Sequence, residues 1–366
     1  MGQLLQETAA FPNLLRAWDC LKGRLPDSVR LSFAWRLEDH LLDLSDGLAA
    51  GAYSPQPEPV GYHSTDSGKK IPVPCLEDRL VLRALKQMLL LRLERSFIHD
   101  TYAGLPGRGV HRAVSRVMAF QRRVAPPSRP RSAWILKADV QNFYPSLRHD
   151  VLLAHCRRRL RDEALVDLLS RFLAIWGRWS GTPGVGIPLG SSPSALFANL
   201  YLDPFDHFVK DELGFKFYVR YADDMAFLSA DRAELEGLLE EVRAFLAERL
   251  ALSLNERKTY FKRTGDGLDF LGYRIFYHHL LLRRKNMKKA RKRLDRMARL
   301  YAQGKLDQED VKRSLAGWLG YARFADTYNF RRRLFAGFRL RKGSATPAPQ
   351  PPNSGGSRMV SPSGLS

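Results

Sequence analysis

Cysteine is scarce in this sequence. Its 366 residues include three cysteines, Cys20, Cys75 and Cys156, which are odd in number and far apart. Cysteines with these spacings form neither a zinc-binding motif nor the paired framework of a small secreted protein. We therefore expect a protein of a reducing compartment, the cytoplasm.

Long apolar segments and a secretory leader are absent as well. The run at 85–91 reads LKQMLLL, so a lysine interrupts it and it is too short to span a bilayer. The first residues lack the basic start, apolar centre and small-residue cleavage site of a signal peptide. We expect no membrane-spanning segment and no membrane partner.

Acidic residues are few relative to basic ones. The chain has 38 Asp and Glu against 59 Lys and Arg, a net charge of +21. Such an excess indicates a polyanionic partner, most often nucleic acid. A basic surface used only for solubility, or an anionic membrane surface, is the alternative. With 45% hydrophobic residues, the chain is long enough for a large core in two or three subdomains.

Periodicity and turn residues predict an α+β chain, in which helices are mixed with a few antiparallel strands. Residues 1–60 are expected to be mainly helical. Further helices are expected over 78–97, 110–122, 149–178, from the loop at 181–190 to about 213, over 232–249 and 286–303, and twice within 307–341. Strands are expected over 61–75, 134–139, 215–229 and 268–282. The segment 342–366 is rich in Pro, Gly and Ser and is predicted to be disordered.

The most informative motif is Tyr221-Ala222-Asp223-Asp224, which lies between two short apolar runs. This pattern predicts a β-hairpin with both aspartates at or beside its turn. Asp is common in turns because it tolerates turn geometry and bonds its own backbone, so the pair alone has an ordinary explanation. Adjacent carboxylates on a rigid hairpin are also hard oxygen ligands that suit Mg²⁺.

A third carboxylate follows a predicted buried strand. The apolar run 134–139 ends in Asp139, which could be a simple strand-end cap. If this strand lies beside the hairpin, three carboxylates converge from two strands and form a site for two metal ions. Such a site activates a primer 3′-hydroxyl and stabilises the leaving pyrophosphate.

Three weaker signals flank these carboxylates. Tyr144 could pack under a sugar and exclude a 2′-hydroxyl, or it could be an ordinary buried tyrosine. The glycine-rich loop 186–190 precedes a helix and could let a ligand approach the backbone closely. Lys258 could donate a proton to departing pyrophosphate, although a single lysine is usually a surface residue.

Taken in order, these motifs resemble the palm blocks of the bacterial reverse transcriptases. The matching stretches are Ala138-Asp139, Phe143-Tyr144-Pro145-Ser146, Gly186-Ile187-Pro188-Leu189-Gly190, Phe197-Ala198-Asn199, Tyr221-Ala222-Asp223-Asp224, Asn255-Glu256-Arg257-Lys258-Thr259 and Phe270-Leu271-Gly272-Tyr273. Blocks near 71–81 and 97–103 look like the fingers of the same family. The segment 317–327 looks like the thumb end of reverse transcriptases from diversity-generating retroelements, so the resemblance covers about 12–341.

The resemblance implies a right-hand polymerase fold with fingers, a palm whose antiparallel sheet packs on helices, and a helical thumb. Its boundaries are an N-terminal helical extension at 1–60, fingers at 61–133, a palm with finger insertions at 134–267, a connecting strand segment at 268–282, a basic thumb at 283–341 and the tail at 342–366.

The resemblance also assigns roles to individual residues. Asp139, Asp223 and Asp224, with the backbone carbonyl of Val140, would bind two Mg²⁺ ions, with Mn²⁺ as a substitute; these aspartates and Lys258 would be catalytic. Tyr144 would favour deoxynucleotides. The incoming nucleotide would contact Lys69, Lys70, Arg79, Gly190 and Ala195. The spacing of the two lysines departs from the usual one, so which of them contacts the triphosphate stays open.

A basic helix in the predicted thumb would follow the primer–template backbone without reading its sequence. Its residues are Arg283, Arg284, Lys288, Lys289, Arg291 and Lys292. A solvated charged helix is the alternative. Met287, Ala290, Leu294 and Met297 share the opposite face and would pack on neighbouring helices.

The predicted function is RNA-directed DNA synthesis by a bacterial retroelement enzyme, a nucleotidyltransferase that extends a primer 3′-hydroxyl with dNTPs on an RNA template. The thumb block favours the diversity-generating type, which works with a small basic accessory protein. Ala195, however, stands where error-prone members usually carry Gln. An antiphage-defence or group II-like orphan enzyme, and an RNA-binding scaffold without synthesis, stay open. An RNA-dependent RNA polymerase is disfavoured by Tyr144.

Overall fold

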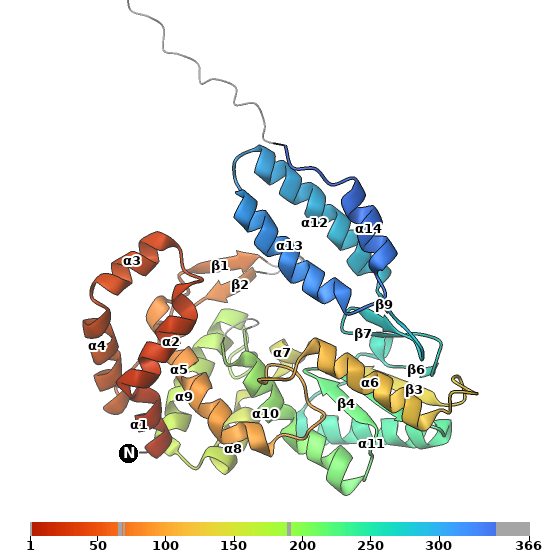
Figure 1. Cartoon of the computed structure of the whole chain (residues 1–366). Helices are drawn as coiled ribbons and strands as arrows, with labels where there is room; N and C mark the ends of the chain where they lie inside the picture. The colour runs from red at the N-terminus through yellow and green to blue at the C-terminus, as the bar shows by residue number, and fades with distance from the viewer. Residues whose placement is uncertain (1, 65–67, 69, 189–191, 342–366) are drawn as a thin grey trace, which may run out of the picture. The chain divides into compact units, whose positions relative to one another are not determined.

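A computed structural model describes residues 2–64, 68, 70–188 and 192–341 (Figure 1). The chain divides into two compact units, residues 1–281 and 282–366, and each is described by itself. Among the helices so described, none is long and apolar enough to cross a membrane.

The first unit begins with helices that pack on one another and on α5. They are α1 (Gln3–Ala9), α2 (Phe11–Lys22), α3 (Asp27–Trp35), α4 (Leu37–Ala49) and α5 (Leu76–Leu93). Leu14, Leu41 and Leu80 are fully buried between them. Between α4 and α5, strands β1 (Gly61–Ser64) and β2 (Lys70–Val73) pair antiparallel, as predicted for this segment.

One predicted helix is in fact two. The periodicity over 149–178 indicates a single helix, but the structure has α8 (His149–Leu160) and α9 (Glu163–Ser180). Arg161 adopts the left-handed conformation at φ 54°, and the Asp162 carboxylate accepts a hydrogen bond from Leu165 N–H at the start of α9. Since the apolar positions continue in phase across the break, periodicity alone does not show it.

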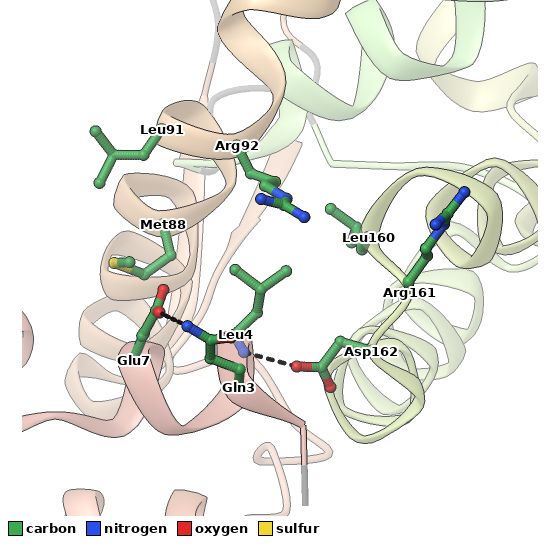
Figure 2. A pocket seen from close by; sticks show the side chains of 9 residues that line it. All are labelled: Gln3, Leu4, Glu7, Met88, Leu91, Arg92, Leu160, Arg161 and Asp162. Atoms are coloured by element: carbon green, nitrogen blue, oxygen red, sulfur yellow. Dashed lines mark hydrogen bonds between the residues drawn. The ribbon is translucent and has the colours of Figure 1, made fainter.

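Asp162 also fixes the first helix of the chain. Its Oδ2 accepts from the backbone N–H of Leu4 at 2.8 Å, which ties α1 to the α8–α9 connection (Figure 2). These segments and the end of α5 surround a cavity of about 340 Å³. None of the predicted site residues lines it, so this cavity plays no part in the chemistry inferred from the sequence.

An antiparallel sheet carries the three aspartates predicted to be catalytic. Its described strands are β3 (Trp134–Asp139), β4 (Tyr218–Tyr221), β5 (Asp224–Ser229) and β6 (Tyr260–Arg263), in the order β4-β5-β3-β6. Successive side chains of a strand point to opposite faces. Residues 135–139 of β3 are all buried, so both faces of the sheet are covered.

Helices α6 (Val110–Val124) and α11 (Arg232–Leu250) pack on β5, and α10 (Ser194–His207) packs on α8 and α11. The remaining elements of this unit are α7 (Phe143–Ser146), the single turns Glu94–Ser96 and Glu256–Lys258, the π-helical turn Phe208–Glu212, and strands β7 (Leu268–Phe270) and β8 (Tyr273–Ile275). Strand β9 (Leu280–Leu282) ends at the first residue of the second unit. The expected α+β class, with antiparallel sheet packed on helices, is confirmed.

The second unit contains the helices α12 (Arg284–Ala302), α13 (Gln308–Arg323) and α14 (Tyr328–Ala336). On α12, Ala290, Leu294 and Met297 are buried, as their helical spacing predicts. The predicted tail at 342–366 lies outside the described residues.

His149 connects α8 to the glycine-rich loop and gives stability a pH dependence. Its Nε2 lies 2.8 Å from the Gly186 carbonyl oxygen, and burial lowers the pKa of the imidazole. The unfolded chain therefore takes up this proton first on acidification, so the free energy of unfolding falls as the pH drops below about 6.5. His155, whose pKa burial also lowers, adds to the same slope.

We predict that His149→Gln, which can still reach the Gly186 carbonyl, reduces this loss of stability. Urea unfolding at several pH values between about 5 and 7.5 measures the slope. His155 should preserve part of it in the variant. Parallel pH profiles for the variant and the wild type would contradict the assignment.

Candidate active site

The hairpin predicted around the two aspartates is present. Tyr221 and Asp224 are paired, so Ala222 and Asp223 form a two-residue turn between β4 and β5. Ala222 has φ 53°, in the left-handed region that residues with a Cβ rarely adopt. Such a turn persists only where its surroundings hold it.

Arg220 supplies that support from inside the core. Its side chain is fully buried, and Nη1 donates to the Ala222 carbonyl at 3.1 Å and to Asn199 Oδ1 at 3.2 Å. The guanidinium also forms a two-pronged ion pair with Asp206 of α10, whose carboxylate is equally buried. The conformation of the turn is thereby tied to α10.

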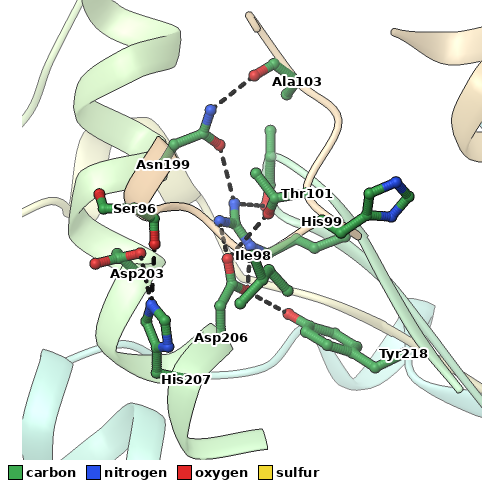
Figure 3. Close-up of polar contacts among 12 residues, drawn as sticks. Ser96, Ile98, His99, Thr101, Ala103, Asn199, Asp203, Asp206, His207 and Tyr218 are labelled. Carbon is green, nitrogen blue, oxygen red and sulfur yellow. Dashed lines mark hydrogen bonds and ion pairs between the residues drawn. The ribbon is translucent and has the colours of Figure 1, made fainter. Parts of the chain in front are cut away.

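The same network holds the loop at 100–103 (Figure 3). Asp206 accepts from Thr101 Oγ1 at 2.9 Å and from Tyr218 OH at 2.8 Å, and Asn199 Nδ2 donates to the Ala103 carbonyl at 2.7 Å. All of these hydrogen bonds join groups within the protein. A buried charge pair is tolerated when its polar atoms are satisfied in this way.

The sheet register brings the third carboxylate to the hairpin. In the antiparallel pairing of β3 and β5, Asp139 stands directly opposite Asp224. Asp223 precedes Asp224 and lies on the adjoining turn. Its backbone carbonyl accepts a hydrogen bond from Val140 N–H at 3.3 Å. Burial and then the charge of Asp139 raise the pKa of Asp223. The strand pairing therefore sets the backbones of the three aspartates side by side, two on paired strands and one on the turn between β4 and β5.

Two lysines neutralise these carboxylates in the structure. Lys258, in the turn Glu256–Lys258, donates to Asp139 Oδ1 at 2.7 Å. Lys137, two residues before Asp139 on β3, is buried and pairs with Asp224. Across the described residues, no three side chains of Asp, Glu, His or Cys are grouped so as to hold a metal ion as they stand.

The donor chemistry nonetheless fits a hard divalent cation. The carboxylates of Asp139, Asp223 and Asp224 are oxygen ligands of the kind Mg²⁺ prefers, gathered at the end of one sheet. Burial, and after it the charge of Asp139, raises the pKa of Asp223, and a bound cation would oppose both effects by favouring the ionised carboxylate.

Tyr144 lies on α7 beside the turn. Its phenol pKa is raised to about 12, first by burial and then by the negative charge of Asp223. The backbone carbonyl of Tyr144 accepts from Ile187 N–H at 3.0 Å, which anchors the start of the glycine-rich loop. The Tyr144 ring, which is predicted to exclude a 2′-hydroxyl, therefore lies near Asp223, a predicted metal ligand.

The predicted nucleotide contacts are only partly described. Arg79 of α5 and Ala195 of α10 line one cavity, whereas Lys70 at the start of β2 is exposed and does not line it. Gly104, at φ 67°, packs so closely on Ala195 that an added Cβ would lie 2.6 Å from the Ala195 Cβ. Lys69 and Gly190 lie outside the described residues.

The six basic residues predicted to follow the duplex are exposed. Five lie on α12 and Arg283 directly precedes it, and the buried side of α12 packs against α13. Asn286 Nδ2 donates to Tyr321 OH at 3.0 Å, and Arg293 donates to Ser314 Oγ at 2.7 Å. The second unit therefore presents a cationic helix face supported by its own contacts.

Comparison with known proteins decides the family. Residues 68–275, more than half of the chain, match the family model described as reverse transcriptase (RNA-dependent DNA polymerase). The chain belongs to the reverse transcriptase family. The matched range contains Tyr144, Lys258 and all three aspartates, so the family resemblance expected from the motifs is confirmed.

One of the relatives is encoded by a group II intron, in agreement with a group II-like lineage. Protein YkfC of Escherichia coli is 28% identical over 277 residues, which are 66% of this chain and 72% of that protein. The group II intron-encoded protein LtrA of Lactococcus lactis is 22% identical over 65% of this chain and 50% of its own length. A telomerase structure from Candida tropicalis is similar at 11% identity and TM-score 0.49, covering 73% of this reverse transcriptase and 53% of that chain. The chain thus spans about half the length of LtrA and of the telomerase chain.

Four residues that complete the site were given no role from the sequence. Arg220, Asn199 and Asp206 form the buried network, and Lys137 pairs with Asp224. The available signal was a charged residue inside an apolar strand: Arg220 precedes Tyr221, and Lys137 interrupts the run 134–139. Such residues are buried only when they are paired.

We predict that Arg220→Met lowers the free energy of unfolding by about 3–5 kcal/mol, because Asp206 is left buried without its cation. Tyr218→Phe is the matched control, since it removes one hydrogen bond to the same carboxylate and should cost only about 1 kcal/mol. Replacing the pair together, Arg220→Met with Asp206→Leu, should recover only part of the loss, because the Ala222 carbonyl and the hydroxyls of Thr101 and Tyr218 lose their partners. Urea unfolding measures all three, and equal small losses for both single variants would show that the pair is not what secures the turn.

Proposed function

We propose that this chain is an RNA-directed DNA polymerase that extends a primer 3′-hydroxyl with dNTPs on an RNA template. The observation that carries the proposal is the convergence of Asp139, Asp223 and Asp224 at the adjoining ends of β3 and β5, inside the segment that matches the reverse transcriptase family.

The carboxylates of Asp139, Asp223 and Asp224, with the Val140 carbonyl, are the groups that would hold two divalent cations, Mg²⁺ or in its place Mn²⁺. When bound, the cations supply charge neutralisation at the phosphoryl oxygens and a more acidic 3′-hydroxyl. Arg220 keeps the turn that carries Asp223 in its left-handed conformation. Lys258 would give a proton to the departing pyrophosphate, and its mostly exposed side chain in contact with Asp139 supports this role.

Substrate recognition is assigned to groups around this centre. Tyr144 would pack against the sugar and exclude a 2′-hydroxyl. Arg79, Ala195 and one lysine of the pair Lys69 and Lys70, together with Gly190, would meet the incoming nucleotide. The exposed cations of α12 would bind phosphates of the primer–template duplex, where contacts position the strand without reading its sequence.

The biological setting we propose is a bacterial retroelement of the diversity-generating kind, within a group II-like lineage. The relative LtrA is encoded by a group II intron, which supports the lineage. The segment 317–327 supports the type, and a small basic accessory protein would then assist. Ala195 stands where error-prone members usually carry glutamine, so whether errors concentrate at template adenines stays open.

We predict that Asp139→Asn and Asp223→Asn each reduce primer extension at least a hundredfold, or about 3 kcal/mol of transition-state stabilisation. Each change keeps the side-chain shape and removes the charge. Asp19→Asn, which removes an exposed carboxylate that pairs with Lys22 on α2, is the matched control and should retain wild-type activity. Extension is measured with an RNA template and Mg²⁺.

Sequencing the product shows whether errors concentrate at template adenines. If the pure wild type is inactive, the assay is repeated with the cognate RNA and the products of neighbouring genes. Failure there too would overturn synthesis and leave the RNA-binding scaffold as the better account.

We predict that Tyr144→Ala lowers the preference for deoxynucleotides over ribonucleotides about tenfold or more, because it opens space for the 2′-hydroxyl. The ratio of kcat/KM for a dNTP and its matching NTP measures this preference. Tyr62→Ala, which removes an exposed tyrosine of β1, should leave the ratio unchanged. An unchanged ratio in Tyr144→Ala would remove Tyr144 from the sugar contact.

A further inference from the structure

Large apolar side chains are exposed together on the N-terminal helices of the first unit. Among the described residues nine such side chains are exposed, and four of them lie close together in the sequence: Val29, Leu31, Trp35 and Leu42. Trp35 is 89% exposed and Leu31 is 63% exposed. Single apolar residues scattered over a surface are normal, whereas a group of them rimmed by polar residues is typical of a protein–protein contact.

Helix α3 is packed on its inner side, so this exposure belongs to an ordered helix. Phe33 is buried, and the centroid of its ring lies 5.1 Å from that of Trp18 on α2 and 4.5 Å from that of His40 on α4. Leu31 and Trp35 come two residues before and two residues after Phe33, about 200° around the helix in each direction. They therefore lie on the side of α3 that faces away from α2 and α4.

The adjoining helix α4 has an acidic outer face. Asp39, Asp43 and Asp46 recur at helical spacing around Leu42, and all four residues are exposed. Asp39 pairs with Arg36 at 2.9 Å, whereas Asp43 and Asp46 form no ion pair among the described residues. The inner face of α4 packs on α1 and α2, and Figure 1 shows α3 and α4 at the edge of the first unit.

This acidity is opposite in sign to the charge of the chain as a whole. Residues 27–50 hold five acidic residues and two arginines, in a chain with a net charge of +21. Carboxylates repel the phosphates of nucleic acid and the headgroups of an anionic membrane. A symmetric contact between two copies would bring the same carboxylates together. Charge complementarity therefore favours a protein of positive charge as the occupant.

We propose that the outer face of α3 and α4, formed by Leu31, Trp35, Leu42, Asp43 and Asp46, is a docking surface for a basic partner protein. Trp35 would enter an apolar pocket of the partner, and lysines or arginines around that pocket would meet the carboxylates. The surface is argued from exposure and charge. For the identity of the partner, the inference rests on the proposed function, which includes a small basic accessory protein.

The probe for this surface is a labelled synthetic peptide, an amphipathic helix with leucine on one face and lysine on the other. The chain as a whole repels such a peptide, because its net charge is +21, so binding requires a local acidic face. Fluorescence anisotropy at several KCl concentrations gives the affinity and its salt dependence. A photoreactive leucine in the peptide cross-links it to its site, which mass spectrometry then maps. A scrambled peptide of the same composition, without the apolar face, is the probe control.

Two variants separate the apolar contribution from the charged one. Trp35→Ser removes an exposed apolar side chain, and Asp43→Lys/Asp46→Lys reverses two charges. Both act on exposed residues, so folding should be preserved. Glu241→Lys/Glu248→Lys is the matched control, since it makes the same change of charge on the exposed face of α11. None of the described residues of α11 is an exposed large apolar one.

We expect Trp35→Ser to weaken peptide binding about tenfold and to leave its salt dependence unchanged, because the charged contacts remain. Asp43→Lys/Asp46→Lys should weaken binding at least about tenfold and reduce its salt dependence. The α11 control should bind the peptide as the wild type does, and the scrambled peptide should bind the wild type more weakly. Cross-links should lie within residues 27–46.

Any of four results would overturn the proposal: no binding of the peptide by the wild type, wild-type affinity in both variants, an equal loss in the α11 control, or self-association of the wild type that Trp35→Ser abolishes. The last result, measured by sedimentation, would assign the face to a second copy of this chain. Peptide binding also separates this inference from the polymerase function. A wild type that binds the peptide through this face but never extends a primer would disprove synthesis and leave the docking surface intact.

Discussion

The antiparallel register between β3 and β5 is the constraint on which the site depends. It sets Asp139 opposite Asp224, with Asp223 on the adjoining turn. A slip of one residue would move every side chain of β3 to the other face of the sheet and separate these carboxylates. The register is held because residues 135–139 are buried on both faces, so any slip would place Lys137 and Asp139 against apolar neighbours without their partners.

The buried pair Arg220 and Asp206 performs a second task that an apolar pair could not. Replacing a buried ion pair by apolar side chains is often neutral for stability, so stability alone does not explain its presence. Arg220, however, also donates a hydrogen bond from Nη1 to the Ala222 carbonyl, and Asn199 Nδ2 donates one to the Ala103 carbonyl. An apolar replacement would leave that carbonyl and the left-handed turn without support. The pair therefore specifies a conformation beside a predicted metal ligand.

The sequence was most predictive where signals were local. The strand 134–139 was predicted with the bounds of β3, and the hairpin predicted over 215–229 contains β4 and β5, although β4 begins only at Tyr218. An apolar run bounded by charge, and two aspartates between apolar runs, are short-range patterns. The break at Arg161 was missed because it depends on one left-handed residue and on Asp162 bonding to α1. The pairing of Lys137 with Asp224 depends on register between strands that are 87 residues apart, which no local pattern contains. The division into fingers, palm and thumb stays a prediction.

The two lysines at the carboxylates differ in a way that bears on their roles. The Lys137 side chain is 6% exposed and extends from the centre of the sheet. Separating it from Asp224 would therefore leave a buried charge unpaired. The Lys258 side chain is 59% exposed, and exchanging Asp139 for another anion costs it little, since water already surrounds most of the ammonium group. Lys137 therefore suits a fixed neutralising role. Lys258 suits the proposed role of a proton donor, because it can leave a carboxylate and approach a departing phosphate. Its position on a single turn after β5 and α11 brings it to the carboxylates without fixing it in the core.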